Sequence, residues 1–524
     1  MNGLRLKIVA HLNAARSKPA GWLLAMWWLV LGKRLRAKTK LAALLGSTPQ
    51  AYELWLLAEP RPPLDESGNA AIIALVDAGQ GEASTLQSAR TQGMPAFLVR
   101  DGVLDEVIDQ IDWALRPWIM PMTAGDSLSS DAVAAYRFAI SQSGSRIIYA
   151  DDDLIDMRGR RHSPHFKPAW NAELHRHFDY VSGACVVQSS ADVLRRIAGP
   201  GWMSRLTAAV TTEADAKPVR LPHILHHRRD RTMPVVPRRM SDASDNTPKV
   251  TVIVPTRNRL DLLATCIAGL ERTNYADFEV IIVDNGSDDP ATLAWLAKLD
   301  RSRYRILRDD GGFNFSRLNN RAVEIADGEV LCLLNNDVEM IRPDWLSIMV
   351  RQAVRPEVGA VGAQLLYSDG RIQHAGVVIG ICGGAAHAHR LLWPDDQGYF
   401  SRHALPQFVS AVTAACLVVR RSSYQAVGGL DEERFAVAFN DVDFCLRLNA
   451  RGWQSLYEPR ARLIHHESVS RGFDRDPAGA LRFAGELDAL KTQWGTDDFD
   501  ADVDPFHHPQ LSRYSEIFAL RAGE

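Results

Sequence analysis

The chain has 524 residues, 46% of them hydrophobic and 23% charged, an ordinary composition for a globular protein of two to four domains. Its formal net charge of −3 gives no general attraction to nucleic acid. The six scattered cysteines include no Cys-x-x-Cys pair, which argues against a disulfide framework or a thiolate zinc site. No apolar run reaches the roughly 18–20 residues that span a bilayer. We therefore expect a cytoplasmic protein.

The first 50 residues contain nine Lys or Arg and no Asp or Glu. Between the basic residues lies Gly21–Gly32, an apolar run with three Trp that is too short to cross a membrane. An apolar body flanked by positive charge suits the surface of an anionic membrane. A signal peptide fits less well, because basic residues resume directly after the run. Two interpretations stay open: peripheral contact with the inner face of the cytoplasmic membrane, or a helix docked on the protein.

Residues 51–225 are predicted to form one α/β domain. Its expected buried strands are Ala71–Val76, Ala96–Val99 and Arg146–Ala150. The third strand is followed by Asp151, Asp152 and Asp153. Three adjacent carboxylates could hold a metal ion, and they could equally form a solvated turn.

A linker, residues 226–248, is rich in Pro, Ser, Asp and Arg and precedes a second domain at 249–475. There, apolar strands alternate with helices of about ten residues, which predicts a parallel, doubly wound sheet. The expected strands are Lys249–Pro255, Phe278–Val283, Tyr304–Leu307, Leu331–Leu334, Gly359–Leu366 and Ala415–Val419. Residues 476–524 are expected to form a helical extension.

Polar side chains follow several of these strands. Asp284 comes directly after the second, and Asn335, Asn336 and Asp337 come directly after the fourth. The carboxyl ends of parallel strands form the ligand-binding edge of such a sheet. Oxygen ligands of this kind suit Mg²⁺ or Mn²⁺ on a diphosphate. The alternative is a solvated turn in which Asp337 has no ligand.

Two later segments carry further chemistry. A helix opens at Asn440 with Asp441 and Asp443 in its first turn, where negative charge is favoured. His465 and His466 are adjacent and can ligate a metal.

A faint internal repeat suggests that the two halves are related folds. Val181–Ser190 is similar to Thr413–Ser423, and Tyr149–Asp152 could correspond to Tyr367–Gly370. Chance similarity between apolar strands is the alternative.

Seven segments stand in a recognisable order: Val252–Asn258, Val283–Asp289, Asn319–Ala322 with Ala326–Glu329, Leu333–Asp337, Val427–Asp431, Asn440–Arg447 and His465–Ser470. Together they resemble the family 2 inverting glycosyltransferases of bacterial polysaccharide and O-antigen assembly. The resemblance implies a GT-A fold for the second domain.

The resemblance also implies roles for single residues. Nucleotide and donor binding fall to Pro255, Thr256, Arg257, Asp284, Asn320, Asn335, Asn336 and Arg471. Asp337 and His465, chosen over His466, would hold Mg²⁺ or Mn²⁺. The usual Asp-x-Asp metal motif begins here with Asn335, so Asp337 is the only carboxylate in it.

Asp441 matches the catalytic base of the family, in a motif that is usually Glu-Asp and here is Asn-Asp. Inversion requires one carboxylate to deprotonate the acceptor hydroxyl as it attacks the anomeric carbon. The alternative is a carboxylate that only interacts with the helix dipole.

The later part of the first domain, residues 126–199, also resembles a glycosyltransferase-like domain. Its metal motif would fall near Ile119–Asp126, where most carboxylates are missing. We interpret residues 51–225 as a smaller, degenerate α/β domain that serves acceptor binding or assembly.

The resemblance therefore predicts a metal-dependent transferase that moves a sugar, with inversion, from a nucleoside diphosphate sugar to a glycan or lipid-linked glycan. A nucleotidyltransferase is less well supported, because no Gly-rich loop carries a Lys for a triphosphate. An inactive glycan-binding or scaffold protein is the third interpretation.

Overall fold

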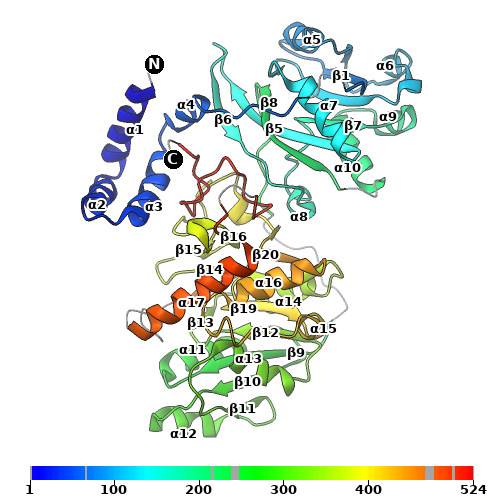
Figure 1. Cartoon of the computed structure of the whole chain (residues 1–524). Coiled ribbons are helices and arrows are strands. Elements are labelled where there is room, and N and C mark those ends of the chain that lie inside the picture. Colours follow the sequence, from blue (N-terminus) through cyan, green and yellow to red (C-terminus); the bar gives the residue numbers. More distant parts are fainter. Residues whose placement is uncertain are drawn as a thin grey trace. The chain divides into compact units, whose positions relative to one another are not determined.

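The computed structural model describes residues 3–64, 68–213, 217–237, 247–466, 477–498 and 502–522. It forms two compact units, each with its own sheet (Figure 1). The first unit comprises Met1–Val235, His507–Ser512 and Leu520–Glu524. The second comprises Val236–Phe506 and Arg513–Ala519.

The first unit begins with the helices α1 (Gly3–Ser17), α2 (Pro19–Val30), α3 (Arg34–Leu45) and α4 (Ala51–Leu56). Leu6 and Ala10 of α1 pack with Ala51 and Leu54 of α4. Of the twelve residues of α2, only Ala25 is buried. Within the described residues, no helix is both long and apolar enough to cross a bilayer.

A mixed sheet forms the body of the first unit, in the order β2-β1-β3-β7-β5-β8-β4, with β6 paired to β5. The strands are β1 (Ile72–Asp77), β2 (Ala96–Val99), β3 (Trp118–Thr123), β4 (Ser127–Leu128), β5 (Ile147–Ile155), β6 (Arg161–His165), β7 (Cys185–Gln188) and β8 (Val219–Arg228). The helices are α5 (Glu82–Arg90), α6 (Asp105–Ile108), η1 (Trp113–Leu115), α7 (Ala132–Gln142), α8 (Ala172–His175), α9 (Ala191–Ile197) and α10 (Trp202–Glu213).

Two assignments in this unit differ from the sequence-based prediction. Asp151, Asp152 and Asp153 do not follow a strand but lie inside β5, where all three are buried. Residues 226–228, which we assigned to the linker, complete β8 by pairing with β5, and His226 and His227 also pair with β4. The long-range pairing of β8 overrides the polar composition that suggested a linker.

The sheet of the second unit has the order β11-β10-β9-β12-β19-β14-β20-β13, with β15 paired to β14 and β18 to β20. Its strands are β9 (Val250–Thr256), β10 (Phe278–Asp284), β11 (Tyr304–Arg308), β12 (Val330–Leu334), β13 (Val338–Met340), β14 (Val358–Leu366), β15 (Ile372–His374), β18 (Gln407–Val409), β19 (Cys416–Arg420) and β20 (Gln454–His465). A separate pair joins β16 (Val377–Ile379) to β17 (Ala385–His387).

Helices cover both faces of this sheet, as a doubly wound fold requires. They are α11 (Leu260–Glu271), α12 (Pro290–Lys298), α13 (Phe315–Glu324), α14 (Trp345–Ala353), η2 (Ile381–Gly383), η3 (Arg402–Ala404), α15 (Arg421–Ala426), α16 (Asn440–Ala450) and α17 (Pro477–Trp494). Val252 of β9 packs under α11 and α14, whereas the neighbouring Ile253 packs under α13 and α16.

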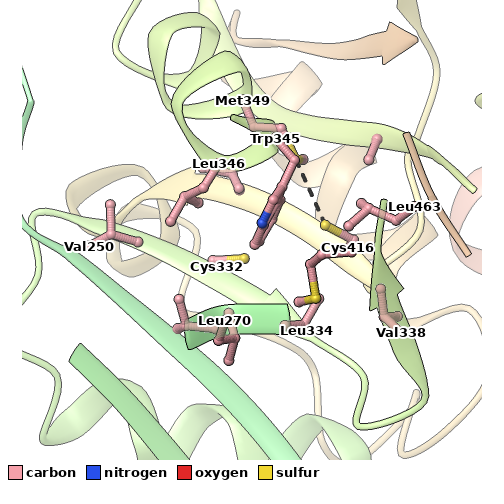
Figure 2. Close-up of a cluster of buried hydrophobic side chains, with 14 of the residues drawn as sticks. Val250, Leu270, Cys332, Leu334, Val338, Trp345, Leu346, Met349, Cys416 and Leu463 are labelled. Atoms are coloured by element: carbon pink, nitrogen blue, oxygen red, sulfur yellow. Dashed lines mark hydrogen bonds between the residues drawn. The ribbon is translucent and has the colours of Figure 1, made fainter. Parts of the chain in front are cut away.

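The core beneath α14 is built around Trp345, which is fully buried. Figure 2 shows its ring directed at the strands that carry Cys332 and Cys416. The Cys416 thiol lies 3.8 Å from the Met349 sulfur of α14. This packing fixes β12 and β19, and with them the polar residues that follow β12.

The predicted α/β fold of the GT-A type is confirmed for the second unit, with one correction to its strand directions. Strands β11, β10, β9 and β12 are parallel. Beyond β12 the sheet is mixed, because β19 runs antiparallel to both β12 and β14. Helix α13 begins at Phe315, because Asn314 caps it by accepting a bond from the Arg317 amide.

Candidate active site

The strands β9, β10 and β12 place several candidate residues at one edge of the sheet. Thr256 and Asp284 are opposite each other at the last positions of β9 and β10. The Asn336 side chain, just beyond β12, donates to the Thr256 hydroxyl at 2.9 Å. Pro255 is a buried residue of β9, and Arg257 follows the strand as an exposed side chain. Parallel pairing therefore brings this set together.

The Asp284 carboxylate is buried and already bonded. It accepts the Ser287 amide at 3.0 Å and the Arg308 guanidinium at 2.5 Å. Arg308 is the last residue of β11 and also bonds Asp310. Sequence reasoning missed Arg308, although a basic residue at the end of the next parallel strand was a visible signal. Arg308 therefore balances the charge of Asp284 at this edge of the sheet.

Asp337 and His465 meet across the antiparallel pair of β13 and β20, in which Val338 is opposite His465. The imidazole Nε2 of His465 lies 3.1 Å from Asp337 Oδ1. Its Nδ1 lies 2.7 Å from the Gln373 side-chain oxygen. Because that oxygen can only accept, Nδ1 donates to it, and in a neutral ring the lone pair of Nε2 then faces Asp337, with the Asn335 side-chain nitrogen 3.3 Å from Nε2.

A lone pair and a carboxylate repel each other unless a proton or a cation lies between them. Two ligands at about 2.1 Å from an octahedral Mg²⁺ are about 3.0 Å apart, close to the separation of Asp337 and His465. In the described part of the chain, no group of three or more His, Cys, Asp or Glu side chains forms a complete metal site. The pair suits an ion that takes its other ligands from a diphosphate and water.

His466 faces different partners. Its Nε2 lies 3.0 Å from Glu339, and its Nδ1 lies 2.8 Å from the Ser368 hydroxyl. It lines a cavity of about 300 Å³ together with Asp337 and Asp261. The geometry thus brings His465, rather than His466, within ligand distance of Asp337.

Asp441 stands in the first turn of α16, after Phe439, which adopts a left-handed backbone at φ 60°. Its carboxylate accepts the Ala414 amide at 3.0 Å and the Val442 amide at 2.9 Å. Burial raises the pKa of Asp441 above its ordinary value, and the hydrogen bonds oppose this rise. A raised pKa suits a group that must take up a proton during a reaction.

The other carboxylate of this turn has a structural role. Asp443 is fully buried and accepts bonds from Arg447 at 2.8 Å, Gln493 at 2.9 Å and Trp494 at 3.1 Å. These contacts join α16 to α17, which lie side by side in Figure 1. Of the two acidic residues, Asp441 is therefore the one available for chemistry.

A short strand, β15, supports both sides of the site. Gln373 bonds His465, and the next residue, His374, has its Nε2 3.5 Å from the Thr413 amide. Thr413 precedes Ala414, whose amide bonds Asp441. Nothing in the sequence pattern marked Gln373 or His374, because neither follows a strand that we had predicted.

Two predicted donor residues are placed less directly. Asn320 of α13 bonds both main-chain groups of Leu430, with its amide nitrogen 2.9 Å from the oxygen and its oxygen 3.0 Å from the nitrogen. It also accepts the Tyr424 hydroxyl at 2.6 Å. Its side chain thereby holds the turn before α16. Arg471 lies outside the described residues.

Comparisons with known proteins agree with this geometry. The model of "Glycosyl transferase family 2" matches residues 251–428. An uncharacterized protein, y4gI, of Sinorhizobium fredii is 39% identical over 457 residues, 78% of this chain and 50% of that protein. The O-antigen biosynthesis protein RfbC of Myxococcus xanthus is 35% identical over 445 residues, 76% of this chain and 34% of that protein.

A third relative is covered more fully. The N-acetylglucosaminyl-diphospho-decaprenol L-rhamnosyltransferase of Mycobacterium tuberculosis is 30% identical over 234 residues, 41% of this chain and 74% of that enzyme. By contrast, the chain spans half of the length of y4gI and a third of that of RfbC. The chain belongs to glycosyl transferase family 2, and the family domain lies in its second unit.

Proposed function

We propose that the second unit transfers a sugar from a nucleoside diphosphate sugar to a hydroxyl of a glycan or lipid-linked glycan, with inversion and with a divalent metal. The observation that carries the proposal is the approach of His465 Nε2 to within 3.1 Å of the Asp337 carboxylate, at the ligand edge of the sheet. The names of two relatives support the acceptor class, since one concerns O-antigen biosynthesis and the other a diphospho-decaprenol acceptor.

Different residues of the site would serve different parts of the reaction. Asp337 and His465 would hold Mg²⁺ or Mn²⁺, which neutralises charge on the departing diphosphate. Thr256, Asp284 and Asn336 form the edge that orients the nucleotide, with Arg308 as an added positive group. Asp441 accepts the proton of the acceptor hydroxyl while the oxygen attacks the anomeric carbon from the opposite side.

A panel of nucleotide sugars, incubated with the protein, Mn²⁺ and glycan acceptors, tests this proposal. We expect release of a nucleoside diphosphate together with a product of inverted anomeric configuration, measured by NMR. Full activity in excess EDTA would contradict the metal, and retained configuration would contradict direct displacement. Binding of glycan without any transfer would favour the scaffold interpretation.

Gln373→Leu should raise the Mn²⁺ concentration needed for half-maximal rate by about 10–100-fold. The loss of the bond to His465 Nδ1 would let the ring rotate, while Asp441 remains unaffected, so kcat at saturating Mn²⁺ should stay close to that of the wild type. The measurement is a metal titration of the initial rate. Gln373→Glu keeps an acceptor oxygen and serves as the matched control; an unchanged titration for Gln373→Leu would rule out this positioning role.

Peripheral contact with a membrane is part of the proposal, and the surface of the N-terminal helices is the evidence for it. Exposed apolar side chains extend over α1, α2 and α3: Leu4, Ile8, Leu12, Leu23, Trp27, Val30 and Leu35. Val30 is 79% exposed and Trp27 is 57% exposed. The same 50 residues carry nine positive charges and no negative one. Exposed apolar side chains that are surrounded only by positive charge suit an anionic lipid surface.

The wild-type chain should therefore sediment with phosphatidylglycerol vesicles at low salt, and Trp27→Glu with Val30→Glu should remove most of this binding. The double variant places two charges into the apolar layer, where each is costly. Met157→Glu is the matched control, because Met157 is 85% exposed but lies in the turn between β5 and β6. Equal sedimentation of the double variant and the wild type would contradict the membrane proposal.

A further inference from the structure

The two units repeat one sheet. The order β2-β1-β3-β7-β5-β8-β4 of the first unit corresponds to β10-β9-β12-β19-β14-β20-β13 of the second, and β6 corresponds to β15. Each corresponding pair of strands also has the same direction. The strands follow in the same chain order, and β11 is an addition at one edge of the second sheet.

This correspondence revises the internal repeat seen in the sequence. Val181–Ser190 and Thr413–Ser423 contain the equivalent strands β7 and β19. Tyr149–Asp152, however, lies within β5, whereas Tyr367–Gly370 follows the end of β14. That second match is wrong, because Tyr149 corresponds to a residue inside β14.

The register of strand pairing shows which residues of the first unit correspond to Asp337 and His465 of the second. The pairs of β4 with β8 are Ser127 with His227 and Leu128 with His226, and those of β13 with β20 are Glu339 with Ile464 and Met340 with Leu463. The next residue of the long strand is Arg228 in the first unit and His465 in the second. In the same register Asp126 takes the place of Val338, and Gly125 takes the place of Asp337.

Arg228, at the place of His465, forms an ion pair with Asp126, which is one residue along from the place of Asp337. Arg228 Nε lies 3.8 Å from Asp126 Oδ2, and both side chains are largely buried. The guanidinium rests against Gly183, where a Cβ atom would approach its central carbon to 2.2 Å. Burial raises the pKa of Asp126 to about 6, and Arg228 opposes this rise. A guanidinium stays charged in proteins, so this site has a permanent cation of its own.

The neighbouring carboxylates on β5 have internal partners too. Asp152 pairs with Lys167 at 2.8 Å, with both side chains 1% exposed, and accepts Arg231 Nε at 2.7 Å. Asp153 accepts Arg161 at 2.5 Å, and Asp151 lies 2.7 Å from His508. The two interpretations that the sequence left open for these carboxylates, a metal site or a solvated turn, give way to a set of buried ion pairs.

The two units also differ at the position of the proposed base, Asp441. Between β7 and β8 the first unit has α9 and α10. At the corresponding place, between β19 and β20, the second unit has α15 and α16. The first turn of α16 carries Asp441, whereas that of α10, which begins at Trp202, has no acidic residue.

We infer that the first unit is a second copy of the GT-A fold in which Gly125 and Arg228 stand at the places of the proposed metal ligands Asp337 and His465, so that its centre takes neither a divalent ion nor a nucleoside diphosphate. Among the described residues, the proposed metal site then lies in the second unit alone, and the first unit keeps its fold without metal. The metal site of the second unit rests on the proposed function, whereas the ion-free first unit does not depend on it.

The loss of the Mn²⁺ EPR signal on binding, measured on the full chain with Mn²⁺ alone and with UDP, GDP or dTDP, tests the inference. We expect one bound ion per chain, lost in Asp337→Asn and retained in Asp126→Asn. A second ion per chain, or an ion lost in Asp126→Asn, would overturn it. A wild-type chain that binds no Mn²⁺ would contradict the metal in the proposed function, yet would agree with an ion-free first unit.

Thermal unfolding tests the built-in cation separately. Arg228→Met, measured in EDTA, should lower the unfolding temperature of the first unit more than Arg228→Lys, which keeps a positive charge beside Asp126. Both variants lose the planar set of N–H donors of the guanidinium, so the difference between their unfolding temperatures measures the effect of the positive charge. If Arg228→Met unfolds at the same temperature as Arg228→Lys, Arg228 does not neutralise this centre.

Discussion

Asp441→Asn should lower kcat by about 10²–10⁴-fold, the usual contribution of a general base, while the affinity for the donor stays close to that of the wild type. The amide has the shape of the carboxylate, and its oxygen can still accept the bonds from Ala414 and Val442. Only the ability to take the acceptor proton is lost. Initial rates with saturating donor, together with calorimetric donor binding, separate the two effects.

Asp300→Asn is the control for this substitution, because Asp300 is a carboxylate in the turn before β11 whose bonds are to Ser302. It should leave the rate unchanged. Turnover near the wild-type level in Asp441→Asn would show that another group removes the proton.

The rate should also fall as the pH is lowered, over a range that starts above the ordinary range of carboxyl groups. Burial raises the pKa of Asp441, so the group becomes protonated, and inactive as a base, at a higher pH than an exposed Asp. The activity is therefore present above the raised pKa and lost below it. A pH profile of kcat/KM measures this limb, and an acidic limb at the pH of an ordinary exposed Asp would contradict the assignment.

Asp337→Asn should have the second large effect, a loss of about 10²–10³-fold in the metal-dependent rate. Loss of the single carboxylate in the Asn335–Asp337 motif removes the negative charge that would hold the cation, and that cation contributes a few kcal/mol to stabilising the leaving diphosphate. His465 alone would be a weak site. Rates and Mn²⁺ binding should fall together.

Asp344→Asn is the matched control, because Asp344 bonds Arg342 in the exposed turn after β13. His465→Ala should resemble Asp337→Asn, and the double variant should be little worse than either, since both residues serve one ion. Additive losses would mean that the two side chains have separate roles.

The parallel half of the second sheet could be predicted closely from sequence. Phe278–Val283 was expected as a strand and Phe278–Asp284 is found. Strands buried on both faces are continuous apolar runs, so their position is visible without knowledge of their neighbours. For the same reason, the residues that follow such strands, Asp284 and Asp337, could be placed at one edge.

The mixed half could not be predicted in this way. Strand β13 has three residues and exists only through pairing with β20, far along the chain, so it depends on tertiary contacts rather than on local pattern. Strand β15 also has three residues and pairs with the end of β14, a few residues before it. Gln373 was missed because so short a strand shows no periodicity, and Asp151 to Asp153 looked like a strand end because charged residues seldom lie within a buried strand.

Because β15 contacts both sides of the site, it would link the binding of the proposed metal to the binding of the acceptor. Gln373 contacts the ring that faces Asp337, and His374 lies against the segment that bonds Asp441. By thermodynamic reciprocity, metal that tightens acceptor binding must itself be bound more tightly when acceptor is present. These three residues of sheet are thus the shared contact through which the proposed metal and acceptor sites would be coupled.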